Sequence, residues 1–208
     1  MNCLASKESN PGPAVPVCAS FAPVDLFSVA RSLTSEMPFA YYARLSAARK
    51  RIYERSDAIG TLGLPPGTTL GGEVRSLRAA LLAENRMAAQ AACQRIADTL
   101  THGYQVPPLR IRVLAQRPSD DFGELHGLYE PEEGRTPSRI TIWMRTAHKQ
   151  HVVAFKSFLR TLCHEICHHL DYELFALQET FHTEGFYKRE SAITNALLAQ
   201  EAAHADLG

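Results

Sequence analysis

The chain lacks several features that would assign it to a common class of protein. Its 22 basic and 22 acidic side chains cancel, so no overall charge attracts nucleic acid, anionic lipid or an acidic substrate. No apolar run is long enough to span a bilayer. The sequence also has no Gly-x-Ser-x-Gly motif, no phosphate-binding glycine loop and no dinucleotide-binding fingerprint. Serine-nucleophile and nucleotide chemistry therefore have no support.

Cysteine is scarce as well. The 208 residues include five cysteines, an odd number without the spacing of a disulfide framework, which is typical of a reducing compartment. Residues 1–20 contain Lys7 and Glu8 and no continuous apolar core, so we expect neither a signal peptide nor a membrane anchor. We therefore expect a cytoplasmic protein without a membrane partner.

The composition changes along the chain and predicts three parts. Residues 1–24 hold four prolines among small polar residues, a composition that cannot bury enough apolar surface to fold, so we expect a flexible tail. Residues 25–72 are predicted to be a helical extension followed by a linker around Pro65 and Gly67. Residues 73–208 form the main predicted domain, and the 45% hydrophobic content of the chain suffices for a core.

The predicted extension is rich in basic residues. Apolar residues recur at helical spacing from Tyr41 to Ile52, with Ser35 as the candidate helix cap. Between the apolar positions lie five basic residues: Arg44, Arg49, Lys50, Arg51 and Arg55. A solvated helix face explains them, and a patch for nucleic acid or a protein partner is the alternative, because only Glu54 dilutes the charge.

The main domain is predicted to be α+β. An alanine-rich stripe without glycine or proline predicts a helix over residues 73–101, and period-two alternation predicts the strands. The remaining predicted elements are strands at 109–114, 123–129 and 139–144, and helices at 153–175 and 183–203. We expect a small, mostly antiparallel sheet packed against the first of these helices and the helix at 153–175.

The strongest chemical signal is the His-Glu-x-x-His sequence at residues 164–168. On a helix the i,i+4 spacing puts His164 and His168 on one face, where both can bind one metal ion with Glu165 beside them. The apolar stripe from Phe155 to Leu170 lies on the opposite face. Because packing does not need these histidines, we predict that they bind one zinc ion per chain.

A catalytic zinc ion takes three protein ligands, so a third ligand is needed from downstream. His182 precedes the last predicted helix and can reach back, and Glu190 lies on an apolar helix face where its carboxylate needs a partner. Asp171 can be a ligand or can accept the second N–H of one. If Glu190 is not the ligand, it is expected to orient one. Cys163 and Cys167 point about 100° away from the histidines, and we predict that they are buried.

Several short motifs occur in a recognisable order. In sequence they are Gly123, Gly127 and Tyr129, then Ile140 and Ile142, then the His-Glu-x-x-His helix, then His182 and Phe186. This order resembles the SprT-like zincin metallopeptidases over roughly residues 103–190. The resemblance implies a zincin-like fold in which the two motif histidines and His182 bind zinc and Glu165 is the general base. The chain departs from the pattern in Glu190, and it lacks the cysteine-rich zinc ribbon of many relatives.

Together these residues predict a zinc-dependent metallopeptidase with a polypeptide substrate. Glu165 would take a proton from the attacking water and pass it to the leaving amine. The strand at 139–144, including Ile140 and Ile142, is the expected sheet edge for an extended peptide. The oxyanion donor is not identifiable, the candidates being Tyr129, His126 and Tyr187. The alternative is a non-catalytic module in which zinc stabilises a surface that binds nucleic acid or a protein.

Overall fold

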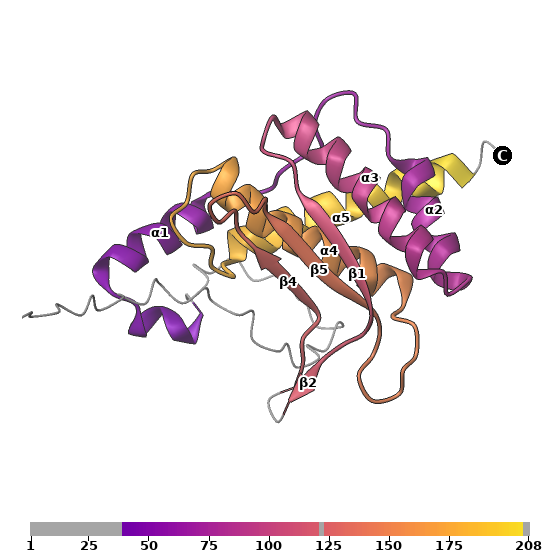
Figure 1. Ribbon diagram of the computed structural model, residues 1–208. Helices are drawn as coiled ribbons and strands as arrows, with labels where there is room; N and C mark the ends of the chain where they lie inside the picture. The colour runs from indigo at the N-terminus through magenta and orange to yellow at the C-terminus, as the bar shows by residue number, and fades with distance from the viewer. Residues whose placement is uncertain (1–38, 121–122, 206–208) are drawn as a thin grey trace, which may run out of the picture.

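The computed structural model describes residues 39–120 and 123–205 (Figure 1). The tail expected over residues 1–24 and the helix cap expected at Ser35 lie outside the described residues. None of the helices in the described ranges is long and apolar enough to cross a membrane.

The extension is two short helices rather than one. A 3₁₀ helix, η1 (Ala40–Arg44), is followed by α1 (Ala47–Ala58). The break falls at Ser46, which has extended backbone angles and caps α1 by accepting a hydrogen bond from the backbone N–H of Arg49. The apolar spacing that predicted one continuous helix from Tyr41 to Ile52 therefore spans a cap.

The single helix predicted over residues 73–101 was also wrong. The structure has α2 (Gly71–Leu82) and α3 (Arg86–Tyr104), separated by residues 83–85. Glu84 has a positive φ of 53°, and the Asn85 side chain caps α3 by accepting a hydrogen bond from the Ala88 N–H. The two helices pack against each other. Their apolar residues, which form one stripe in the sequence, belong to the same core.

The main sheet has three strands in the order β1-β5-β4. Strand β5 (Arg139–Arg145) pairs parallel with β1 (Arg110–Gln116) and antiparallel with β4 (Gly127–Glu130). The sheet is therefore mixed, and the expected mostly antiparallel pairing was wrong. The placement of residues 139–144 at a sheet edge was wrong too, because β5 is the central strand. Ile140 and Ile142 are buried beneath the helices and face the core.

The strand predicted at residues 123–129 is divided. Its first part, β3 (Gly123–Glu124), pairs with β2 (Ser119–Asp120) in a separate two-stranded sheet. Its second part is β4, which begins at Gly127. Residues 125 and 126 lie between these two parts and connect the hairpin to the edge of the main sheet.

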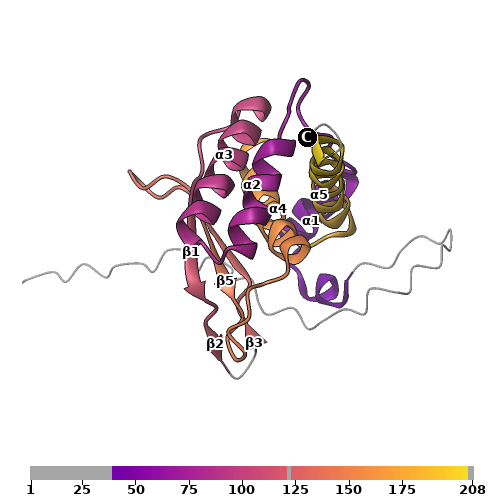
Figure 2. The same ribbon diagram turned by 90° about the vertical axis from the view of Figure 1, so that its right-hand side faces the viewer.

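The helices cover one face of the main sheet in two layers (Figures 1 and 2). Helix α3 packs on β1, and α4 (Phe155–Glu173) packs on β4 and β5. Helix α5 (Glu184–Ala205) lies against α4, with α2 near its C-terminal end and α1 near its N-terminal end. The expected helices at residues 153–175 and 183–203 correspond to α4 and α5.

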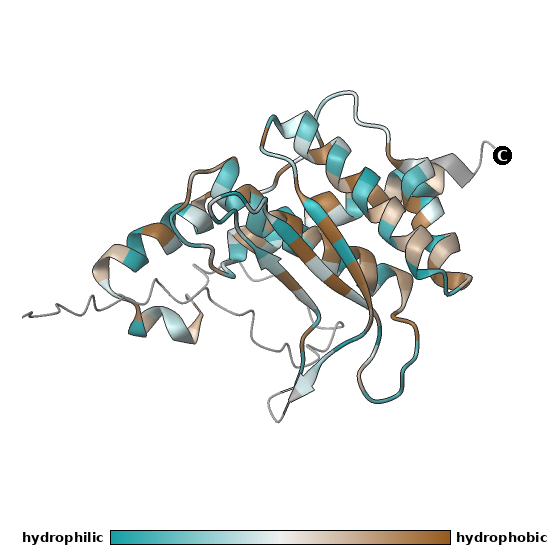
Figure 3. Cartoon of the chain, in the orientation of Figure 1, coloured by the Kyte–Doolittle hydropathy of each residue, from teal (hydrophilic) through white to brown (hydrophobic). Residues whose placement is uncertain are grey.

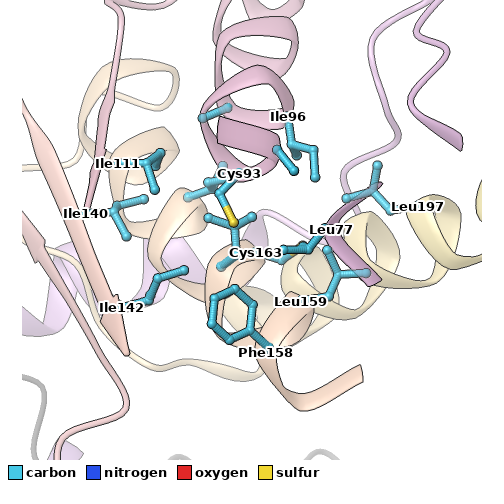
Figure 4. Packing of buried hydrophobic residues seen from close by; sticks show 14 of the residues in the cluster. Leu77, Cys93, Ile96, Ile111, Ile140, Ile142, Phe158, Leu159, Cys163 and Leu197 are labelled. Atoms are coloured by element: carbon cyan, nitrogen blue, oxygen red, sulfur yellow. The ribbon is translucent and has the colours of Figure 1, made fainter. Parts of the chain in front are cut away.

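The core lies between the sheet and the helices, and α2, α3, α4 and α5 all contribute residues to it. Hydrophobic residues concentrate along β1 and β5 in Figure 3, and in Figure 4 Ile140 and Ile142 face Cys163 and Phe158 of α4. Cys163 and Cys167 are buried in this core, as predicted from their direction on the helix. The apolar face of α4 thus packs in the core, and the motif histidines lie on its other face.

Helix α1 docks closely on α5 at Gly185. A Cβ at this position would lie within 2.7 Å of the carbonyl oxygens of Ser56 and Ile59, and closer still to that of Asp57. The Gly185 N–H also donates to the Asp57 carboxylate, 3.0 Å away. A side chain at residue 185 would therefore push α1 away from the rest of the protein.

We expect Gly185→Ala to lower the free energy of unfolding by about 1–3 kcal/mol because of this overpacking. Alanine is the better helix former, so helix propensity alone predicts the opposite sign. Urea denaturation monitored by circular dichroism measures the change. Gly63→Ala is the matched control, since no atom lies within 4 Å of a Cβ there. An unchanged or raised stability for Gly185→Ala would contradict the close docking of α1.

Candidate metal centre

Three histidines converge beside the face of α4 that is opposite its apolar stripe. His164 and His168 lie one turn apart on this helix, with their Nε2 atoms 3.2 Å apart. The loop before α5 brings in His182, whose Nε2 lies 3.0 Å from that of His164 and 3.1 Å from that of His168. In residues 39–120 and 123–205 these three form the group of side chains that could hold a metal ion.

The other ring nitrogens determine which atoms face the centre. Nδ1 of His164 lies 2.8 Å from a carboxylate oxygen of Glu190, and an ionised carboxylate can only accept, so Nδ1 carries the proton. Nδ1 of His168 lies 2.8 Å from the Thr180 hydroxyl, which in turn donates to Asp171. Both rings therefore turn their Nε2 atoms toward the centre.

This arrangement fits a zinc ion. The three Nε2 atoms lie 3.0–3.2 Å apart, so one cation can contact all of them. In a tetrahedral zinc site with bonds of about 2.0–2.1 Å, neighbouring ligand atoms lie about 3.3 Å apart. Three imidazole nitrogens at nearly this spacing could supply three of the four positions of such a site.

Burial keeps two of the three histidines in their neutral form. Burial lowers the pKa of His182 to about 3, with a further contribution from His164. Burial also lowers the pKa of His168 well below its usual value, assisted by the two neighbouring histidines. Metal binding needs the unprotonated imidazole, so both side chains are in the binding form at neutral pH.

The two acidic residues considered as third ligands lie elsewhere. Glu190 contacts the Nδ1 side of His164, away from the group of Nε2 atoms, and its other oxygen lies 3.3 Å from Arg160. Asp171 binds Thr180 and Arg189 at 2.8 Å each. The structure thus brings His182 into the metal group and puts both carboxylates behind the ligand rings.

Glu165 lies in a closely packed position against β4. The residue is 2% exposed, and its Oε2 has no hydrogen-bond partner in the described part of the chain. A Cβ on Gly127 would collide with this carboxylate, so glycine is required for their contact. Burial raises the pKa of Glu165 to about 7, against the opposing effects of His164 and the Tyr129 backbone. The pKa of this carboxylate is therefore close to neutral pH.

The three candidates for stabilising an oxyanion lie in different surroundings. The Tyr129 hydroxyl lies 3.1 Å from Nδ1 of His169, which ties it into the core. His126 is half-buried in the residues before β4, where burial and Arg117 lower its pKa. The ring of Tyr187 lies 6.0 Å from that of His182, so it is the candidate beside the metal group.

The basic residues of the extension are partly engaged within the protein. Arg49 forms an ion pair with Glu179, the ammonium group of Lys50 lies over the Tyr42 ring, and Arg55 donates to a backbone carbonyl. Arg44 and Arg51 are exposed. Binding of nucleic acid by this helix stays a prediction.

Sequence reasoning missed the contacts between the extension and the metal loop. The Tyr41 hydroxyl donates to the backbone carbonyl of His182 at 3.0 Å, and its ring stacks on Phe181. Phe39 packs edge-on against Tyr187. In the sequence Tyr41 was read as an apolar helix position, and no local pattern indicates a partner 141 residues away.

No protein-family model, curated protein or solved structure matches this chain.

We expect Glu165→Gln to stabilise the metal-free protein increasingly as pH rises. In the folded protein the pKa of Glu165 is about 7, which exceeds the ordinary value of 4.5. The contribution of Glu165 to wild-type stability is therefore fully present below pH 4.5 and is lost as pH rises through 7. The variant cannot ionise and escapes this loss, so its advantage should grow by on the order of 2–3 kcal/mol and then level off. Titrations of groups that do not interact with residue 165 occur in both proteins and cancel in the difference, whereas the effect of His164 on Glu165 is part of the difference.

Urea denaturation in the presence of a chelator at a series of pH values from about 5 to 8 measures this difference. A difference that does not change with pH would contradict the burial of an ionisable carboxylate at residue 165.

Proposed function

We propose that the chain is a zinc-dependent metallopeptidase of the SprT-like zincin type. The observation that carries the proposal is the combination of three converging Nε2 atoms with a buried carboxylate one residue from the first of them. A structural zinc site needs a fourth protein ligand and no such carboxylate.

The roles of the residues follow from their positions. His164, His168 and His182 would hold the ion, which when bound supplies Lewis-acid activation of a water and of the scissile carbonyl. Glu165 takes the proton from the attacking water and returns it to the leaving amine. A pKa near neutrality suits a group that must both accept and release a proton at physiological pH.

Strand β4 is the surface that we assign to an extended peptide. It is an end strand of the main sheet, since it pairs with β5 on one side only. A peptide pairing along an end strand gains main-chain hydrogen bonds without any requirement on its side chains. Gly127 begins this strand and contacts Glu165, so a peptide on β4 would lie next to the general base.

The alternative is a zinc-stabilised module that binds nucleic acid or a protein without catalysis. The exposure of Arg44 and Arg51 on the extension supports it. Both functions need the three histidines, whereas only the peptidase needs Glu165.

Cleavage of a broad peptide library by the zinc-loaded protein tests the proposal. We expect Glu165→Gln to keep its zinc and to lose about 10²–10⁴-fold in cleavage rate, which is the usual contribution of a general base. Gly127→Ala should lower the rate as well while zinc is kept, because the added methyl group displaces the Glu165 carboxylate. Gly63→Ala provides the matched control.

Two outcomes would contradict the proposal. Wild-type protein that binds zinc but cleaves no peptide would favour the binding module. Cleavage that survives Glu165→Gln would remove the general-base assignment.

A further inference from the structure

A chain of hydrogen bonds leads away from the metal centre behind His168. Its Nδ1 lies 2.8 Å from the Thr180 hydroxyl, and that hydroxyl donates to Oδ2 of Asp171 at 2.8 Å. The other oxygen of Asp171 accepts from Arg189, also at 2.8 Å. His164 differs in this respect, since its Nδ1 contacts the carboxylate of Glu190 directly.

The direction of the protons in this chain is determined by chemistry. A hydroxyl has one proton, and the Thr180 proton goes to the Asp171 carboxylate, which cannot donate when ionised. The Thr180 oxygen must then accept from the Nδ1–H of His168. The hydroxyl therefore holds His168 in the tautomer that presents its Nε2 lone pair to a metal ion.

The end of the chain is a buried ion pair. Asp171 is 0% exposed and Arg189 is 1% exposed, so neither charge is stable here without the other. Burial raises the pKa of Asp171, and the Arg189 charge and the Thr180 hydrogen bond oppose that rise. Arg189 therefore keeps the Asp171 carboxylate able to accept the hydrogen bond from the Thr180 hydroxyl.

Arg189 also binds the end of the extension helix. Its guanidinium donates to the backbone carbonyls of Ser56 at 2.8 Å and Ile59 at 2.5 Å, and to the Ser56 hydroxyl at 3.0 Å. The last carbonyls of a helix lack partners within the helix and carry its negative dipole end, so a buried cation satisfies them. The same guanidinium thus contacts α1 on one side and Asp171 on the other.

We propose that Thr180 is a positioning residue of the metal centre, and that the chain Thr180–Asp171–Arg189 makes the docked helix α1 part of that centre. The proposal rests on the metal group but not on peptidase activity. It assigns the extension a role in setting metal affinity, which is separate from any role of its basic residues in binding a partner.

The first test compares two substitutions of one residue. Thr180→Val keeps the shape but removes the hydroxyl, and we expect zinc affinity, measured by competition with a chromophoric chelator, to fall about 10–100-fold. Thr180→Ser keeps the hydroxyl and should retain the wild-type affinity. Thr99→Val is the matched control, because the Thr99 hydroxyl bonds to the Arg95 carbonyl within α3, which carries none of the three histidines.

A spectroscopic readout separates positioning from general loosening. In the Co²⁺-substituted protein the visible absorption of the metal reports the ligand geometry. We expect Thr180→Val to change this spectrum and Thr180→Ser to leave it as in the wild type. Equal spectra and equal zinc affinities for the valine variant and the wild type would overturn the assignment of Thr180.

The second test concerns α1. Ser56→Ala removes one hydrogen bond to Arg189, and we expect a loss in zinc affinity of up to about tenfold. The Ser56 hydroxyl also lies 3.4 Å from that of Thr183, next to His182, so a second route to the metal exists. A double-mutant cycle distinguishes the two routes, because an effect carried through Thr180 disappears in the Thr180→Val background.

Each outcome has a separate meaning. Loss of the Ser56→Ala effect in the Thr180→Val background supports the chain through Arg189. An effect that persists there would overturn the chain through Thr180 and Arg189 and would assign the effect to the contact between Ser56 and Thr183. If the wild-type protein binds no zinc, the metal centre itself is wrong, and the proposed function fails with it.

Discussion

The convergence of three imidazole Nε2 atoms is the constraint on which the rest of the structure depends. These atoms lie 3.0–3.2 Å apart, which is close to the spacing of ligand atoms around one shared cation. The protein holds them there by binding the opposite ring nitrogens of His164 and His168. The Thr180 hydroxyl behind His168 donates in turn to the buried Asp171 carboxylate, whose charge requires Arg189 and, through it, the end of α1. Helices distant in sequence are thereby joined at one site.

The sequence predicted those parts of the fold that follow from local periodicity. The α+β class and the two helices that became α4 and α5 were expected from their apolar spacing. The break at residues 83–85 was missed, because a stripe that continues across a short turn looks like one helix. Strand order was not predictable from pattern: β5 is the most apolar strand, and burial at the centre of a sheet explains that as well as burial at an edge.

Part of the candidate site could be predicted from the sequence for a different reason. The i,i+4 spacing places His164 and His168 on one face of any helix, whatever the tertiary structure. The choice between His182 and Glu190 depends on how the loop before α5 folds back, which spacing does not determine. Thr180 carried no signal at all, since a threonine in a loop is common and its role comes from two hydrogen bonds made only in the folded chain.

The central claim is that three histidines bind one metal ion. Titration of the metal-free protein with zinc, followed by calorimetry, tests it most directly when wild type, His182→Ala and Glu190→Gln are compared. We predict one tightly bound zinc per wild-type chain, a much larger loss of affinity for His182→Ala, and a smaller loss for Glu190→Gln, which keeps an acceptor for the His164 N–H. Unchanged zinc binding in His182→Ala, together with its loss in Glu190→Gln, would contradict the account.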